Sequence, residues 1–158
     1  MEQLFLQTIN EHQRILHKVC RMYTSNQDDH NDLFQEMVLQ LWKAFPSFRN
    51  EAKITTFMYR IALNTAISGI RKKKVKTTEL ESISFQIQET TEENFNDELK
   101  LLYASIEQLS DVEKSIVLLF LEDKPYDEIA EITGISANYV AVKMNRIKEK
   151  LRKLLNVK

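Results

Sequence analysis

The chain has 158 residues, which suffices for one ordinary domain or for two small helical modules. Its 2 Gly and 2 Pro are too few for the many tight turns of an all-β fold, whereas 43% hydrophobic residues can form a core. The net charge of -1 argues against a uniformly basic surface, and Cys20, the single cysteine, excludes an intrachain disulfide and a metal site built on paired cysteines.

The N-terminal segment predicts one amphipathic helix from Leu4 to Tyr23. Its inward positions step by threes and fours along a single face, as a helix requires. They are Phe5, Ile9, His12, Leu16, Val19 and Tyr23. The segment lacks the layout of a secretory signal, and no apolar run reaches the roughly 18 residues of a membrane span, so we expect a cytoplasmic protein without membrane insertion.

A second helix is predicted to about Phe45, with Asp28 or Asp29 as its N-cap and Pro46 as its stop. Its buried stripe comprises Leu33, Phe34, Met37, Val38, Leu41, Trp42 and Phe45. A third helix is predicted from about Thr56 to Lys74, where it ends in basic residues. The first module is therefore expected to be a bundle of three helices.

Residues 76–98 are polar, acidic and without sustained periodicity, which predicts a flexible linker. The brief alternation of Ile83, Phe85 and Ile87 leaves open an extended stretch that pairs with a partner. Basic residues concentrate on both sides of this linker, so two cationic surfaces can bind DNA although the total charge is near neutral. The two clusters are Arg71, Lys72, Lys73, Lys74 and Lys76, and Lys143, Arg146, Lys148, Lys150, Arg152, Lys153 and Lys158, the second opposed only by Glu149.

The C-terminal part predicts a helix from Leu99 and a capping box at Ser110–Glu113, followed by a helix-turn-helix. In that motif a short helix begins at Pro125 or Tyr126 and ends at Gly134, a residue that accepts the left-handed turn. Ser136 then caps a long helix to about Leu155. Ala130 is expected where the two helices cross, and Ile135 is expected to be buried.

The outward side of the last helix is expected to face duplex DNA, with Val140, Met144 and Ile147 turned inward. Asn pairs with adenine, Arg pairs with guanine, and Ala contacts the thymine methyl group. The predicted DNA-binding residues are Asn138, Tyr139, Ala141, Lys143, Asn145 and Arg146. The basic residues beyond them, Lys148, Lys150, Arg152 and Lys153, are interpreted as general phosphate contacts or solubilising charges.

Two groups of motifs resemble a known family. The runs Asp32–Glu36 and Thr56–Asn64, followed by Arg71–Lys73, look like region two of bacterial RNA polymerase sigma factors, and the C-terminal helix-turn-helix looks like region four. Together they resemble the extracytoplasmic-function group of the sigma-70 family over nearly the whole chain. The resemblance implies an all-α fold with region two at 1–75, a linker at 76–98 and region four at 99–158.

The resemblance also implies partners: core RNA polymerase through its beta-prime clamp helices and beta flap, promoter DNA, and an anti-sigma factor as a further candidate. The clamp-binding residues would be Asp32, Gln35, Glu36 and Gln40. An acidic, polar helix face suits a basic coiled coil, although the same residues also fit the solvated side of an amphipathic helix.

The unpaired minus-ten element of the promoter would contact the loop Phe48–Thr55 and the third helix. The duplex minus-thirty-five element would contact the last helix. The minus-ten residues would be Phe57, Tyr59, Arg60, Asn64, Arg71 and Lys72, which offer stacking, hydrogen bonds and positive charge. The family commonly has tryptophan where this chain has Phe57, so a core role for Phe57 stays open beside a stacking role.

Two other classes of protein explain the sequence less completely. An enzyme needs a reactive group with a partner, and neither such a pair nor a glycine-rich phosphate loop is visible, so we expect no catalysis and no cofactor. His12, His17 and Cys20 share a helix near metal-ligand spacing but lack a further ligand, so no metal is expected. A helix-turn-helix regulator that does not bind polymerase explains the C-terminal part alone.

Overall fold

The structure is a computed structural model that describes residues 2–76 and 97–155, and over these residues it contains helices and no strand. Its contacts divide the chain into two compact units, residues 1–89 and 90–158. Nearly all of the predicted linker, including the alternation at Ile83, Phe85 and Ile87, lies outside the described residues. The all-α fold that the family resemblance implied is confirmed.

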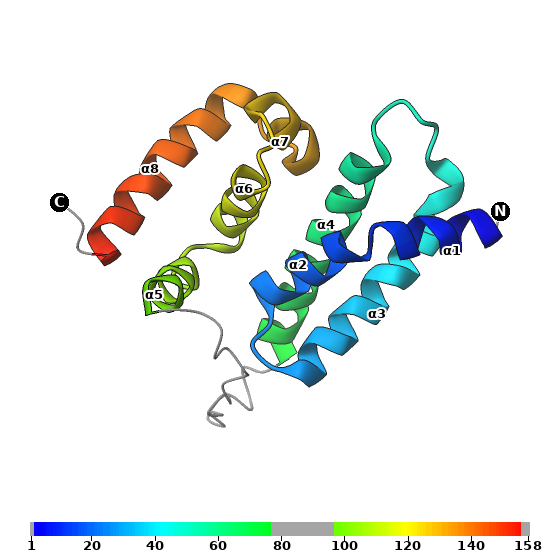
Figure 1. Ribbon diagram of the computed structural model, residues 1–158, viewed down its shortest axis with the longest axis horizontal. Helices are drawn as coiled ribbons and strands as arrows, with labels where there is room; N and C mark the ends of the chain where they lie inside the picture. Colours follow the sequence, from blue (N-terminus) through cyan, green and yellow to red (C-terminus); the bar gives the residue numbers. More distant parts are fainter. Residues whose placement is uncertain (1, 77–96, 156–158) are drawn as a thin grey trace. The chain divides into compact units, whose positions relative to one another are not determined.

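The first unit is built on three helices that pack pairwise against one another, α2 with α3, α2 with α4 and α3 with α4 (Figure 1). In chain order its elements are α1 (Glu2–Glu11), α2 (Gln13–Tyr23), α3 (Gln27–Ala44), the 3-10 turn η1 (Phe45–Ser47) and α4 (Ile54–Lys76). The most deeply buried side chains come from all three packed helices and include Leu16, Met37, Leu41 and Met58.

The single N-terminal helix predicted from Leu4 to Tyr23 is wrong, because the structure has two helices that meet at His12. His12 has φ -119° and ψ 23°, which lies outside the helical region. Phe5 and Ile9 are buried residues of α1, and Ile15, Leu16 and Val19 are buried residues of α2. The apolar spacing continues across the break, so periodicity alone does not reveal it.

The start of α3 also differs from the prediction. Asn26 is the N-cap, in extended conformation, and its side-chain oxygen accepts a hydrogen bond of 2.8 Å from the backbone N–H of Asp29. Asp28 and Asp29 lie instead in the first turn, where their charges favour the positive end of the helix dipole. At the other end, the helix stops before Pro46, as predicted, and gives way to η1.

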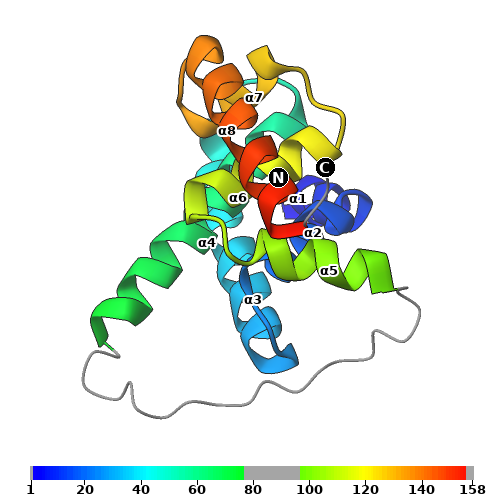
Figure 2. The same ribbon diagram turned by 90° about the vertical axis from the view of Figure 1, so that its left-hand side faces the viewer.

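The second unit contains α5 (Asp97–Ile106), α6 (Asp111–Leu121), α7 (Tyr126–Thr133) and α8 (Ala137–Leu155). α8 packs against all three of the others (Figure 2). The predicted capping box is confirmed: the Ser110 hydroxyl accepts from the Glu113 backbone N–H at 3.2 Å, and the Glu113 carboxylate accepts from the Ser110 N–H at 2.9 Å. This box fixes where α6 begins.

The core of the second unit has contributions from α6, α7 and α8. Its most deeply buried side chains are Ile116, Leu119, Ile129, Val140 and Ile147. None of the helices described, in residues 2–76 or 97–155, combines the length and apolar character that crossing a membrane requires.

Candidate nucleic-acid and partner interfaces

The outer side of α3 presents the four residues predicted to contact a partner. Asp32, Gln35 and Glu36 are exposed and Gln40 is half-buried, while Met37 and Leu41 point into the core from the same helix. The Gln40 amide donates a hydrogen bond of 2.8 Å to the Glu36 carboxylate. This hydrogen bond links two of the four residues on the outer side of the helix.

Two apolar side chains on α3 are exposed beside this acidic surface. Leu39 lies three and four residues beyond Glu36 and Gln35, so it neighbours both on the helix. Trp42, predicted to be buried, is 43% exposed, and its ring packs against the Phe5 ring in a T-shaped arrangement with centroids 5.0 Å apart. We therefore correct the predicted stripe at Trp42. An exposed tryptophan is typical of a protein-binding surface, because aromatic side chains are enriched at interfaces.

Along α4, the predicted minus-ten residues fall into different environments. Arg60 and Asn64 are exposed one turn apart on one side of the helix. Phe57 is half-buried and its ring packs against Phe48 from the preceding loop, with centroids 4.9 Å apart and planes tilted by 46°. The two rings join the loop to the helix and remain partly accessible.

Tyr59 is a correction, since its side chain is 2% exposed and lies in the core of the first unit. Its ring cannot stack on a base in this conformation. α4 buries a wide stripe because it packs against both α2 and α3, and Met58, Tyr59, Ala62 and Leu63 all belong to it. Arg71 and Lys72 follow on the same helix, whose backbone continues to Lys76, but their side chains lie outside the described part.

The helix-turn-helix predicted between Tyr126 and Leu155 is present. α7 ends at Gly134, which has the left-handed φ of 84° and donates its backbone N–H to the Ala130 carbonyl at 2.8 Å. The hydroxyl of Ser136 then accepts from the Tyr139 N–H at 3.1 Å and caps α8. Ala130 and Ile135 are both half-buried, so the predicted full burial of Ile135 is corrected.

On α8 the predicted division into two sides is confirmed for the inward residues, because Val140, Met144 and Ile147 are buried. Asn138, Tyr139, Asn145 and Arg146 are exposed, whereas Ala141 and Lys143 are half-buried at the two edges. The Lys143 ammonium lies 5.8 Å from the centre of the Tyr139 ring, within reach of a cation–π interaction. Val142, which is not among the predicted DNA-binding residues, is 44% exposed on the same side.

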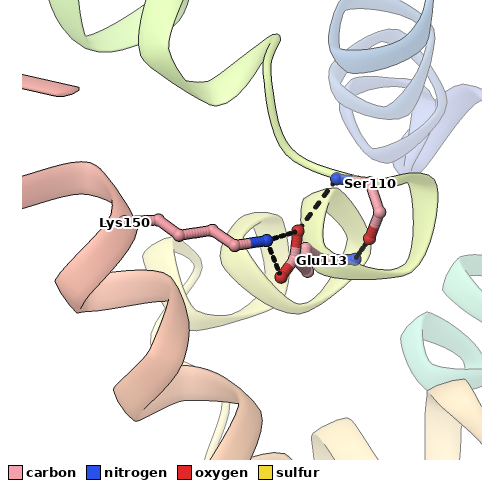
Figure 3. Close-up of polar contacts among 3 residues, drawn as sticks. All are labelled: Ser110, Glu113 and Lys150. Atoms are coloured by element: carbon pink, nitrogen blue, oxygen red, sulfur yellow. Dashed lines mark hydrogen bonds and ion pairs between the residues drawn. The ribbon is translucent and has the colours of Figure 1, made fainter. Parts of the chain in front are cut away.

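Lys150 was interpreted as a general phosphate contact or a solubilising charge, but its ammonium donates to both Glu113 carboxylate oxygens, at 3.0 and 2.8 Å (Figure 3). Glu113 itself is 3% exposed. Burial raises the pKa of Glu113, but hydrogen bonds from Lys150 and from the Ser110 backbone outweigh burial, and the pKa lies below its ordinary value. Glu113 thus links the start of α6 to the last turns of α8.

Two other cations near the end of α8 also have partners. Arg152 forms an exposed ion pair with Glu149 at 2.7 Å, and the Lys148 ammonium lies 5.3 Å from the centre of the Phe120 ring. The second basic cluster is therefore less open than its composition indicated. Lys153 is exposed near the end of the same helix.

The histidines and the cysteine of the N-terminal segment occupy separate environments. Cys20 is fully buried beside Met37, with 3.8 Å between the sulfur atoms, and burial raises the pKa of its thiol to about 12. His17 stacks on Phe34, and a hydrogen bond of 3.0 Å joins His17 Nδ1 and His30 Nε2. Among the described residues no three His, Cys, Asp or Glu side chains gather as metal ligands would.

Comparison with known proteins places both units in described families. Sigma-70 region 2 matches residues 8–75, and the Sigma-70, region 4 family matches residues 99–151. The chain is 31% identical to the RNA polymerase sigma factor SigV of Bacillus subtilis, over 94% of this chain and 89% of that protein. It is 27% identical to the ECF RNA polymerase sigma factor SigW of the same organism, over 89% of this chain and 82% of that protein.

Solved structures agree in fold. The sigma factor RpoE from Bartonella quintana, solved in complex with the anti-sigma factor NepR, superposes with a TM-score of 0.74 at 20% identity, over 99% of this chain and 96% of that chain. CnrH, solved in complex with the cytosolic domain of CnrY, gives a TM-score of 0.69 at 19% identity, over 99% and 90% of the two chains.

Proposed function

We infer, because the chain belongs to the extracytoplasmic-function group of the sigma-70 family, that it is an RNA polymerase sigma factor that directs transcription initiation from promoters. The observation that carries this inference is the presence of both regions in one chain, each with its own surface. A helix-turn-helix regulator would need the second unit only. Such a regulator would leave unexplained the polar outer side of α3 and the match of the first unit to region 2.

The acidic side of α3 is proposed to bind the beta-prime clamp helices of core polymerase. Asp32 and Glu36 supply negative charge, Gln35 and Gln40 supply hydrogen bonds, and the exposed side chains of Leu39 and Trp42 add apolar contact. A central apolar contact with charged neighbours gives a protein interface both affinity and orientation. The beta flap of the polymerase is proposed to bind the region 4 unit.

The side of α4 that carries Arg60 and Asn64 is proposed to bind the unpaired minus-ten strand. An exposed guanidinium and amide one turn apart can contact successive phosphates or base edges, and the partly accessible Phe48–Phe57 pair offers a surface for stacking. Arg71 and Lys72 are proposed to continue this contact along the strand. Because bases are captured only when unpaired, binding favours the melted state of the promoter, and no covalent bond is broken.

The outer side of α8 is proposed to read the duplex minus-thirty-five element through Asn138, Tyr139, Ala141, Lys143, Asn145 and Arg146. The fixed turn at Gly134 and the cap at Ser136 hold the start of α8 in place, as a helix that enters the major groove requires. An anti-sigma factor is proposed as a further partner, since the similar solved sigma factor RpoE is in complex with the anti-sigma factor NepR.

The experiment that tests this function is a binding titration of labelled protein with purified core polymerase. Glu36→Lys is expected to weaken binding at least about tenfold, because charge reversal places like charges together at the clamp. Glu11→Lys is the matched control: it makes the same charge change at an exposed position of α1 and should leave affinity unchanged. Equal affinity of both variants would contradict the assignment of α3 as the polymerase-binding surface.

A further inference from the structure

Val142 occupies an unexpected position on α8. It lies two residues after Val140 and two before Met144, both buried, so it points about 200° away from Val140 around the helix. One turn before it is Asn138 and one turn after it is Arg146, both exposed. A 44% exposed aliphatic side chain therefore lies in the middle of the side that carries the polar groups.

Neither folding nor helix formation explains this residue. Val142 does not add to the core of the second unit, and a β-branched side chain is a poorer helix former than alanine or lysine. Isolated exposed apolar residues are common on proteins, so exposure alone would carry no conclusion. The informative fact is the position between an amide and a guanidinium that are suited to reading bases.

In the major groove, base pairs present hydrogen-bonding groups and one apolar group, the C5-methyl of thymine. An aliphatic side chain held between two polar readers finds a favourable contact only there. The two residues at the edges of the outward side are less suited to this contact. Ala141 is half-buried, and the Lys143 ammonium lies near the Tyr139 ring.

We propose that Val142 determines specificity for a thymine in the minus-thirty-five element by packing its methyl groups against the C5-methyl of that base. This inference rests on the proposed function, because it needs α8 to lie in the major groove. It assigns the thymine contact to Val142 rather than to Ala141, the alanine predicted from the sequence to bind DNA. The polar neighbours would then fix the register of the helix on either side of that base.

The test uses the full-length protein assembled with core polymerase. The preferred minus-thirty-five sequence is first selected from a randomised duplex library. Each thymine in it is then replaced singly by deoxyuridine, which pairs identically and lacks only the methyl group. We expect one replacement to weaken holoenzyme binding about three- to fivefold, the effect of losing one buried methyl contact.

Val142→Ala is then combined with the deoxyuridine series in a double-mutant cycle. The variant should bind thymine-containing DNA about three- to fivefold more weakly than wild type and lose nothing further at the sensitive position, because the contact is already gone. Leu154→Ala, which truncates another exposed aliphatic side chain of α8, is the control and should keep the full deoxyuridine effect.

Retention of the full deoxyuridine effect by Val142→Ala would overturn the assignment, as would wild-type indifference to deoxyuridine at every position or a selected element without thymine. In each of these cases the holoenzyme still binds its element, so the proposed function survives. Failure to form a holoenzyme, or to select any upstream element, would overturn both.

Discussion

The Lys150 ammonium and the Glu113 carboxylate form a bidentate pair between α8 and α6, with N–O distances of 3.0 and 2.8 Å. The carboxylate is nearly inaccessible to solvent, whereas about half of the Lys150 side chain is exposed. Glu113 also completes the capping box of α6. One side chain therefore defines the start of one helix and holds the end of the helix proposed to read DNA.

Lys150→Ala is expected to lower the stability of the second unit by about 1–2 kcal/mol, because a buried carboxylate loses its charged donor. Hydrogen exchange of the amides in α6 and α8 measures this locally and separates it from the first unit. Arg152→Ala breaks an exposed ion pair and is the control, with an expected change near zero. Equal protection in Lys150→Ala and wild type would show that the pair contributes nothing.

The His17–His30 pair predicts a dependence of stability on pH. Burial, followed by the charges of His17 and Arg21, lowers the pKa of His30 below its ordinary value of 6.5. The unfolded chain therefore binds a proton on His30 at a higher pH than the folded chain does. As the pH falls through 6.5 towards the folded pKa, the free energy of unfolding of the first unit should decrease, and below that pKa this contribution stays constant.

Urea unfolding followed by Trp42, the only tryptophan, reports on the first unit and should show this loss of stability between about pH 7.5 and pH 5.5. His30→Gln removes the titrating group. The free energy of unfolding of this variant should therefore decline less than that of wild type over the same pH range, whatever its value at pH 7.5. A decline of the same size in the variant would assign the effect to other groups.

Variants of α8 should separate base readers from phosphate contacts. Asn138→Ala and Arg146→Ala are expected to weaken binding to particular upstream sequences, by about 1–3 kcal/mol for a lost bidentate contact. Lys153→Ala should weaken binding to all sequences alike. It should also lower the slope of log binding constant against log salt concentration by about one, because one fewer counterion is released. Binding to a panel of promoter duplexes at several salt concentrations measures both effects. If all three variants affected every sequence equally, the proposed orientation of α8 on the DNA would be wrong.

The two glycines should respond to alanine in opposite directions. Gly134 has a φ of 84°, and although a Cβ there would meet no atom within 4 Å, the left-handed backbone costs alanine about 1–2 kcal/mol. Gly69 lies within α4 with equally open space around it, so Gly69→Ala should stabilise by about 0.5–1 kcal/mol. Hydrogen exchange in each unit measures the two changes. Destabilisation by Gly69→Ala would contradict this reading of the local backbone.

Most features that depend on neighbouring residues were predictable from the sequence, although the N-cap of α3 is Asn26 and not Asp28 or Asp29. The capping box at Ser110 and Glu113, the turn at Gly134 and the cap at Ser136 each involve groups within four positions, and all three are present. The break at His12 was missed because the apolar spacing continues through it. A local pattern reports which side of a helix is apolar but not where the helix bends.

Features that depend on which helices meet were not predictable. Glu113 and Lys150 are 37 positions apart, so nothing in the sequence pairs them. Tyr59 is buried because α4 packs against two helices at once, which widens its inward stripe beyond what amphipathic spacing shows. Val142 was not among the predicted DNA-binding residues, although its spacing from Val140 and Met144, both predicted to face inward, already places it on the outward side of α8.

The central claim is that this chain confers promoter recognition on core RNA polymerase. Run-off transcription from a template carrying the selected promoter tests it most directly, with core enzyme alone, the chain alone, and the two together. We predict a transcript of defined length only from the combination, and its loss when the upstream element is scrambled. Tight binding of the chain alone to duplex DNA, with no affinity for core enzyme and no transcript, would contradict the account.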